Sequence, residues 1–206
     1  MKPIRAVFFD FGGVLYRIPD RARMQRWLRL FGTHDHGALA MLSSSPRQSE
    51  LVMRIMTGSL PEQQAWDQLA RQMRLHPAIF ALFRSTGYNR RRLDQAMAKF
   101  LVNLRPRYRT AILTNAGTDF RSTFFRVYGL EKLADHVIIS AEVGLAKPDP
   151  AIYQLAADRL EAHPEECVFV DDMLENVEAA REVGMHAVHH TNTLQTLQQL
   201  GHLLES

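Results

Sequence analysis

Residues Ile4 to Leu15 read Ile-Arg-Ala-Val-Phe-Phe-Asp-Phe-Gly-Gly-Val-Leu, and this stretch sets the fold of the chain. Its apolar run, Ala6 to Phe9, is rich in strand-forming residues and stops abruptly at Asp10, which predicts a buried strand. Gly12 and Gly13 let the backbone turn sharply and approach a ligand closely. Because ligands of open parallel sheets bind beyond the carboxyl ends of the strands, we expect Asp10 at the mouth of such a crevice. A surface aspartate that only starts a turn is the alternative interpretation of this segment alone.

The composition is that of an ordinary globular protein. The chain has 206 residues, of which 46% are hydrophobic and 23% charged, enough for one large domain or a core with an inserted smaller one. A single cysteine excludes a disulfide framework and favours a reducing compartment. The first strand begins within about five residues of the N-terminus, which leaves no room for a cleavable signal. No apolar run approaches the roughly 20 residues that cross a bilayer, so we expect a cytoplasmic protein without a membrane segment.

The net charge of +3 conceals an uneven distribution. Residues 15 to 105 carry 15 Lys and Arg against 6 Asp and Glu, whereas the rest of the chain carries 10 against 16. Such a basic segment fits solvated helix faces, a lid over an anionic substrate, or a nucleic-acid surface. Because many of these arginines recur at helical spacing, solvated helix faces are the simplest interpretation. Nucleic acid is not the partner that we expect.

Periodicity divides the chain into two parts. Residues 15 to 105 show apolar stripes at helical spacing and no sustained alternation, which predicts an all-helical cap domain. Residues 1 to 14 and 106 to 206 alternate short apolar runs with helical segments, which predicts an α/β core with a doubly wound parallel, Rossmann-like sheet. The helices expected to flank the site are one after Gly117, one opened by Lys147-Pro-Asp-Pro150, Asn176–Val183, Leu194–Leu204 and, as the last cap helix, Arg91–Leu104. The predicted strands are Ala6–Phe9, Ala111–Leu113, Val137–Ile139, Val168–Val170 and Ala187–His189.

Polar side chains suited to an anion and a metal ion follow three of these strands or begin a helix. Several carboxylates at one crevice repel each other, so a divalent cation is the natural counter-ion. Oxygen-only ligands point to Mg²⁺. Together with a hydroxyl, an amide and an ammonium they suit phosphoryl transfer, for which an aspartate can be the nucleophile. These residues are Asp10, Thr114, Asn115, Lys147, Asp171 and Asp172.

Four motifs of the chain resemble those of the haloacid dehalogenase-like hydrolase superfamily. They occur in that family's order, and with the closing strand and helix the resemblance covers essentially the whole chain. It implies a helical cap inserted after the first strand of the core. The motifs are Asp10-Phe-Gly12-Gly-Val, Leu113-Thr114-Asn115, Gly144-Leu-Ala-Lys147-Pro-Asp-Pro and Val170-Asp171-Asp172-Met-Leu-Glu-Asn176.

The resemblance assigns a catalytic role to three of the matching positions. It implies that Asp10 is the nucleophile and that Lys147 offsets the charge on the nucleophile and the phosphate. It also implies that Thr114, with Asn115 beside it, binds the phosphoryl group that is transferred. Thr114, Asn115 and Lys147 are thus the expected substrate contacts.

The same resemblance implies a Mg²⁺ site formed by Asp10, Asp172 and the backbone carbonyl of Gly12. Asp171 would support Lys147 or the waters of the metal, and Asn176 would have a supporting role beside it. Alternatively, Asp171 and Asn176 only cap the helix that follows them.

Gly12 departs from the pattern of the family's phosphatases, which usually carry at this position an aspartate that protonates the leaving group. Dehalogenases of the family lack this acid as well, because a halide leaves without a proton. The acidic pair Asp171 and Asp172 favours phosphoryl transfer, since halide displacement needs no metal. The resemblance therefore implies a Mg²⁺-dependent phosphatase that forms an aspartyl-phosphate.

The substrate implied is a small phosphorylated metabolite, with sugar phosphates among the candidates. A metal-independent 2-haloacid dehalogenase and a non-catalytic binding protein on the same fold are the alternatives. A monomer and a homodimer are both compatible with the sequence.

Overall fold

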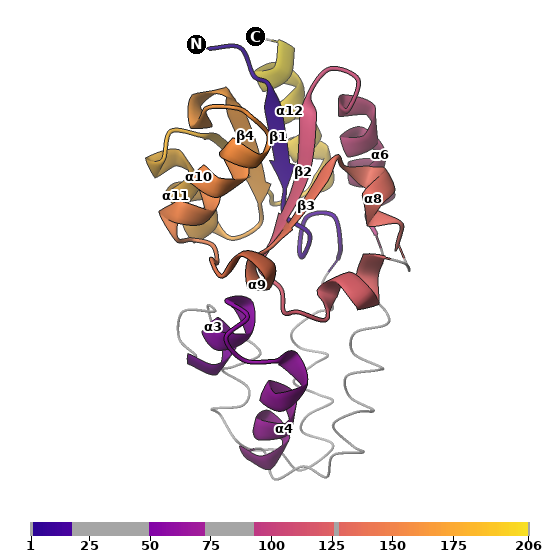
Figure 1. Cartoon of the computed structure of the whole chain (residues 1–206). Coiled ribbons are helices and arrows are strands. Elements are labelled where there is room, and N and C mark those ends of the chain that lie inside the picture. Colours follow the sequence, from indigo (N-terminus) through magenta and orange to yellow (C-terminus); the bar gives the residue numbers. More distant parts are fainter. Residues whose placement is uncertain (1, 18–49, 73–92, 126–127, 206) are drawn as a thin grey trace.

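The computed structural model describes residues 2–17, 50–72, 93–125 and 128–205 of the chain (Figure 1). Within these residues, five parallel strands form one sheet in the order β3-β2-β1-β4-β5. Each strand predicted from the sequence lies within one of them. The strands are β1 (Ala6–Phe9), β2 (Arg109–Thr114), β3 (His136–Ile139), β4 (Cys167–Asp171) and β5 (His186–His189).

The central strand, β1, is buried on both faces. Val7 and Phe9 belong to one hydrophobic cluster, whereas Ala6 and Phe8 belong to the cluster on the opposite face. Because successive side chains of a strand point to opposite sides, this one strand contributes to both halves of the core. A strand covered by helices on both sides reads as a continuous apolar run, and this is why its bounds follow directly from the sequence.

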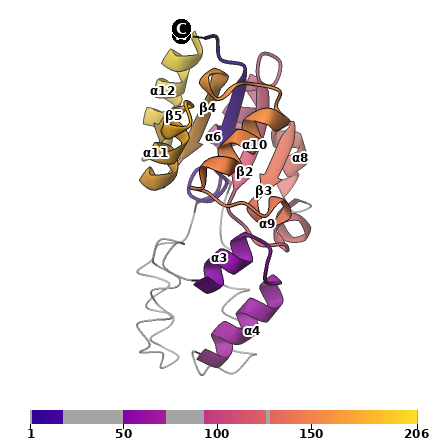
Figure 2. The same cartoon turned by 60° about the vertical axis from the view of Figure 1, so that its left-hand side comes forward.

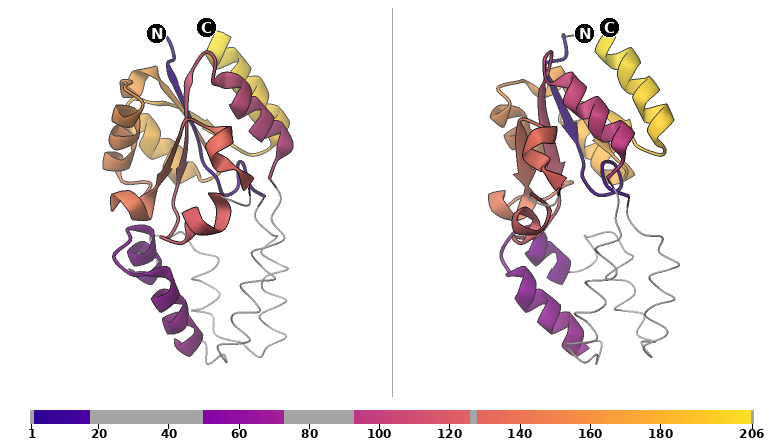
Figure 3. Two further views of the ribbon diagram at one scale, coloured as in Figure 1. Left: turned by 45° about the vertical axis from the view of Figure 1, so that its right-hand side comes forward. Right: turned by 90° about the vertical axis from the view of Figure 1, so that its right-hand side faces the viewer.

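Helices cover both faces of the sheet (Figures 2 and 3). One face is covered by α6 (Gln95–Leu104), α8 (Leu130–Leu133) and α12 (Thr193–Glu205), and α6 and α12 lie side by side (Figure 3). The other face is covered by α10 (Pro150–Arg159) and α11 (Leu174–Glu182). The predicted doubly wound α/β fold is thereby confirmed.

Helix α6 packs against the sheet, although the sequence analysis placed it in the cap domain. Its buried residues Met97, Leu101 and Leu104 belong to the same cluster as Val7 and Phe9 of β1. An amphipathic pattern tells which face of a helix is buried but not against which partner. We therefore propose that the insert spans residues 17–92, rather than 15–105.

The start of α6 also differs from its predicted start at Arg91, a residue outside the described part of the chain. The helix begins at Gln95 because Asp94 caps it: the carboxylate accepts the backbone N–H groups of Ala96 and Met97, at 3.1 Å each. Two further elements differ from the predicted helices, one in where it begins and one in its type. Helix α11 begins at Leu174, two residues before the predicted start, and the turn η2 (Arg121–Phe125) after β2 is π-helical.

The described part of the insert consists of α3 (Glu50–Met56) and α4 (Glu62–Gln72), drawn in purple beyond the carboxyl ends of the strands (Figure 1). The turn between them contacts the core at α9 (Ser140–Val143), where a Cβ built on Gly58 would lie 2.3 Å from the carbonyl oxygen of Ala141. The other helices predicted for the insert lie outside the described residues.

The two connections between insert and core lie next to each other. Tyr16 and Leu93 form an isolated antiparallel bridge. Beside it, the buried carboxylate of Asp94 accepts hydrogen bonds from Arg17 at 3.1 Å and from Thr193, at the start of α12, at 2.9 Å. The chain thus leaves and re-enters the core at one point. Among the described helices, none combines the length and the apolar character that a bilayer crossing requires.

Candidate active site

The carboxyl ends of β1, β2 and β4 meet at the end of the sheet nearest α3 and α4 (Figure 1). Asp10 follows β1 directly, Thr114 is the last residue of β2, and Asp171 is the last residue of β4. The parallel register places Phe9 opposite both Ile112 and Val170. Asp10 and Asp171 each come one residue later and Thr114 two residues later, so all three lie at the same edge of the sheet. The sheet therefore brings together side chains that lie more than 100 residues apart in the sequence.

Lys147 forms the centre of this group. Its Nζ donates hydrogen bonds to Oδ1 of Asp10 at 2.8 Å and to Oδ2 of Asp171 at 2.6 Å. The ammonium also lies 5.2 Å from the ring centre of Phe169, a favourable position for a cation. All three charged side chains are buried, with at most 10% of each exposed. Lys147 thus fixes the rotation of the Asp10 carboxylate and leaves Oδ2 of Asp10 without a hydrogen-bond partner among the described residues.

Asn115 holds the backbone of Lys147. Its Nδ2 donates to the carbonyl oxygen of Lys147 at 2.7 Å, and its Oδ1 accepts the N–H of Lys147 at 2.9 Å. Both ends of the side-chain amide are therefore used within the protein, and they set the position from which the lysine reaches Asp10. A contact between Asn115 and substrate stays a prediction.

Asp171 is fully buried and accepts hydrogen bonds from three groups. Besides Lys147, Nδ2 of Asn176 lies 3.0 and 3.1 Å from its two oxygens, and the backbone N–H of Met173 lies 2.8 Å from Oδ1. The contact with Met173 fixes the turn that leads into α11, so Asp171 both holds Lys147 and shapes the start of that helix. Asn176 acts through Asp171.

Two groups near the carboxyl ends of β1 and β2 have no hydrogen-bond partner within the described part of the chain. Thr114 is buried, and its hydroxyl has no partner among the described residues. The bridge between Gly12 and Tyr16 uses the carbonyl of Phe11 and the N–H of Gly13. The carbonyl of Gly12 is therefore left unpaired within the part of the chain that the structure describes. Buried polar groups are normally paired, so the Thr114 hydroxyl indicates a missing ligand, whereas the half-buried Gly12 is accessible to a ligand or to solvent.

Asp172 extends the acidic group toward the loop after β1. One oxygen each of Asp10, Asp171 and Asp172 lies within 4.8 Å of the others. The carboxylate of Asp172 packs against the backbone of Gly13, whose φ of +92° lies in the region that favours glycine. Because Asp171 is saturated by internal donors, Asp10 and Asp172 are the carboxylates that a cation would bind.

The electrostatics of the site favour an added positive charge. Burial, followed by the negative charges of Asp171 and Asp172, raises the pKa of Asp10 to about 7, although Lys147 opposes the shift. Burial and the charge of Asp171 likewise raise the pKa of Asp172 to about 6. Burial would lower the pKa of Lys147, but the attraction of Asp10 and Asp171 outweighs it and raises that pKa above its usual value.

The donor set fits Mg²⁺. Two carboxylates and an unpaired backbone carbonyl are hard oxygen ligands, which this ion prefers while it keeps several waters. A cation bound between Asp10 and Asp172 would also relieve their repulsion and lower both pKa values. Asp10 and Asp172 are thus compatible with such an ion by chemistry and position, and the part of the Gly12 carbonyl stays a prediction.

Three sets of contacts that shape the site were not predicted from the sequence. Ser140 comes directly after β3, whose last residue pairs with Thr114 at the end of β2. Its buried hydroxyl accepts the N–H of Ala116 at 3.0 Å and donates to the carbonyl of Ala116 at 3.2 Å. Its position at a strand end was a usable signal. Gly13 contacts Asp172, and His189 at the end of β5 bonds the backbone of Asp172. No local pattern reveals these two contacts.

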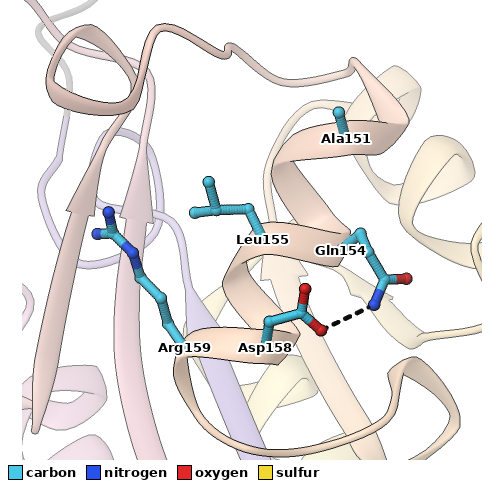
Figure 4. Close-up of a pocket in the computed structure, with 5 residues that line it drawn as sticks. All are labelled: Ala151, Gln154, Leu155, Asp158 and Arg159. Atoms are coloured by element: carbon cyan, nitrogen blue, oxygen red, sulfur yellow. Dashed lines mark hydrogen bonds between the residues drawn. The ribbon is translucent and has the colours of Figure 1, made fainter.

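Two open grooves lie outside this site. One lies on the outer side of α10 and is lined by Ala151, Gln154, Leu155, Asp158 and Arg159, with a hydrogen bond of 3.0 Å from Gln154 to Asp158 (Figure 4). None of these five is a predicted site residue. The other groove lies beside β5 and α12, and His189 forms part of its wall.

The chain was compared with known proteins. Residues 4–184 match the family model described as haloacid dehalogenase-like hydrolase. A sesquiterpene phosphatase of Aspergillus oryzae is 30% identical, and the match covers 97% of this chain and 96% of that protein. An (S)-2-haloacid dehalogenase of a Pseudomonas species is also 30% identical, over 91% and 85%.

Among solved structures, a HAD family enzyme of Bacteroides thetaiotaomicron, crystallised with magnesium and inorganic phosphate, has a TM-score of 0.76. Its sequence identity is 19%, over 94% of this chain and 98% of that chain, so this likeness shows the shared fold. Together with the four strand-end motifs, the family match over residues 4–184 means that the chain belongs to the haloacid dehalogenase-like hydrolases.

Proposed function

We propose that this hydrolase is a Mg²⁺-dependent phosphatase that acts on a small phosphomonoester, with sugar phosphates among the candidate substrates. The observation that carries the proposal is the pair Asp10 and Asp172. Both carboxylates are largely removed from water and repel each other, and the pKa of each is raised. The pKa values of both carboxyl groups stay raised although Lys147 lowers them, so an additional cation would stabilise the charged forms. Displacement of a halide by Asp10 would require no second carboxylate at this place.

The catalytic roles follow from the contacts. Lys147 holds Oδ1 of Asp10, so the other oxygen is directed to attack phosphorus. A P–O bond forms to Asp10, the bond to the leaving oxygen breaks, and this oxygen takes a proton from water. Water then attacks the phosphorus of the aspartyl-phosphate, which releases inorganic phosphate and regenerates the carboxylate.

The remaining groups bind the anion. The unpaired hydroxyl of Thr114 would donate to a phosphoryl oxygen, and the Lys147 ammonium would offset the charge that grows there in the transition state. Mg²⁺, bound by Asp10, Asp172 and the carbonyl of Gly12, would supply further positive charge and orient the phosphoryl group. Asp171 and Asn176 keep Lys147 in place throughout.

A 2-haloacid dehalogenase is the second candidate. Gly12 offers no acid to a leaving group, as a halide requires none, and one relative is a 2-haloacid dehalogenase at 30% identity. In that reaction Asp10 would attack carbon and expel the halide as an anion, and water would then hydrolyse the ester. Asp172 would have no part in these steps.

One experiment separates the two candidates. The purified chain is assayed against a panel of phosphomonoesters and, in parallel, 2-haloacids, each with Mg²⁺ and with EDTA. We expect phosphate release that requires Mg²⁺ and an acid-stable, hydroxylamine-sensitive phosphoprotein that Asp10→Asn does not form. Halide release that persists in EDTA, with no phosphate release, would instead establish the dehalogenase.

Further predictions complete the proposal. We expect the insert, residues 17–92, to cover the site and to select the substrate. A cytoplasmic location and a monomeric or homodimeric state stay predictions, which fractionation of cells and light scattering of the purified chain would test.

A further inference from the structure

His189 makes one specific contact with the acidic group. Its Nε2 lies 3.0 Å from the backbone carbonyl oxygen of Asp172. A carbonyl oxygen only accepts hydrogen bonds, so Nε2 carries the proton and donates it. The contact follows from strand pairing: His189 stands opposite Asp171 in the β4–β5 register, and the N–H of His190 donates to the carbonyl of Asp171 at 2.8 Å.

The two neighbouring acids differ in how they are held. The Asp171 carboxylate accepts hydrogen bonds from Lys147, Asn176 and the backbone of Met173. Within the described residues, no side chain other than His189 donates a hydrogen bond to Asp172. The peptide between Asp172 and Met173 is therefore held at its N–H by Asp171 and at its carbonyl by His189.

We propose that His189 is a positioning residue for the metal site, which keeps the carboxylate of Asp172 directed toward Asp10. The inference rests on the proposed function, since it assigns Asp172 to Mg²⁺. Without His189, the carbonyl of Asp172 loses its partner, and only the hydrogen bond from Met173 to Asp171 still limits the rotation of this peptide. The carboxylate would then spend less time where a cation between the two aspartates can bind both.

The place of His189 allows a clean test. Its ring lines an open groove of 460 Å³ beside β5 and α12, so a polar replacement does not have to fit a closed core. His202 lines the same groove and provides a control for changes of the groove itself. The side chain of His189 is half-buried, so an amide side chain, which is also polar, can replace it there.

The experiment compares two amides of different reach. In His189→Gln the side-chain nitrogen reaches about as far as Nε2, whereas in His189→Asn it is one methylene too short. Mg²⁺ affinity of the substrate-free proteins is measured by isothermal titration calorimetry, together with kcat, KM and the Mg²⁺ dependence of turnover. Melting in EDTA confirms that each variant is folded.

We expect His189→Asn to weaken Mg²⁺ binding about 10-fold, the lower end of the range for residues that orient metal ligands. His189→Gln should weaken it clearly less, because its amide can still reach the carbonyl of Asp172. KM for the phosphate substrate at saturating Mg²⁺ should stay unchanged, and His202→Asn should bind Mg²⁺ like wild type. Equal affinity of His189→Asn and wild type, or equal losses in both His189 variants, would overturn the inference alone. A wild-type protein that binds no Mg²⁺ would overturn the proposed function as well.

Discussion

A Cβ atom built on Gly13 would lie 2.2 Å from Oδ2 of Asp172, so the backbone after β1 and this carboxylate are in direct contact. The loop of β1 and the end of β4 therefore fit together only with glycine at position 13. The contact joins the strand that carries the proposed nucleophile to the acid proposed to bind Mg²⁺.

Gly13→Ala should displace Asp172 and weaken Mg²⁺ binding by about 100-fold, the upper end of the range for residues that orient metal ligands. The φ of +92° adds a backbone penalty of roughly 1 to 2 kcal/mol. Gly144→Ala is the matched control, because Gly144 has a φ of +71° but no atom within 4 Å of its Cβ position. Calorimetry with Mg²⁺ and urea unfolding measure both effects. If the two variants bind Mg²⁺ equally well, the contact with Asp172 does not shape the metal site.

The two neighbouring acids should give opposite phenotypes. Asp171→Ala removes the partner of Lys147 and Asn176 from a fully buried place, which we expect to cost about 3 to 5 kcal/mol of stability and most of kcat. Asp172→Ala should instead abolish Mg²⁺ binding and leave the stability of the metal-free protein unchanged or higher, because it relieves repulsion. Urea unfolding in EDTA and Mg²⁺ titrations of activity separate the two. Parallel losses in both assays would show that the acids share one role.

The stability of the metal-free protein should depend on pH through Asp10. Its pKa is about 7 in the folded protein and 3.8 as the ordinary value, so between these pH values the folded state holds a proton that the unfolded state has released. Stability therefore falls as the pH rises from about 4 to 7. From pH 5 to 8 in EDTA, wild type should lose on the order of 2 kcal/mol more than Asp10→Asn.

Saturating Mg²⁺ should remove this difference, because the cation lowers the pKa of Asp10. The comparison with the variant also cancels the titration of His190, whose pKa burial lowers and whose effect on stability has the opposite sign. Identical pH slopes for wild type and Asp10→Asn would mean that Asp10 is already ionised in the metal-free protein.

Gly12 should make turnover sensitive to the leaving group. A positioned acid contributes about 10²- to 10⁴-fold, and this help matters for alkyl phosphates and hardly for nitrophenyl phosphate, which leaves unprotonated. We expect faster turnover of aryl than of simple alkyl phosphates, and Gly12→Asp should raise the rate on the alkyl esters selectively. A series of leaving groups at saturating Mg²⁺ provides the measurement. A flat dependence in the wild type would reveal another acid, which the insert would have to supply.

The sheet and the meeting of strand ends were predictable because they rest on short, local patterns. Each strand is an apolar run bounded by polar or glycine residues, and parallel strands bring their carboxyl ends to one edge whatever lies between them. Asp10, Thr114 and Asp171 could thus be placed near each other from their positions after strands. The prediction needed no knowledge of the packing of the helices.

The remaining features depend on contacts between segments far apart in the sequence. The apolar stripe of α6 predicted a helix but not that Met97 and Leu101 face the sheet. The predicted contact of Asn115 with substrate stays a prediction, and its hold on the backbone of Lys147, 32 residues away, could not be foreseen. The hydrogen bond from His189 to Asp172 arises from strand pairing, which sets neighbours that no single segment encodes.

The bridge between Tyr16 and Leu93 has a consequence for how this protein can change over evolution. The core itself holds the two ends of the insert together, and Asp94 ties them to α12 through Thr193. The entropy of closing a loop grows only with the logarithm of its length, at about 0.6 kcal/mol for each doubling. Long and short inserts therefore reduce the stability of the core by almost the same amount through loop closure. Apart from core contacts such as that of Gly58, the length and sequence of the insert can change toward a new specificity, while the lysine and carboxylates at the strand ends stay the same.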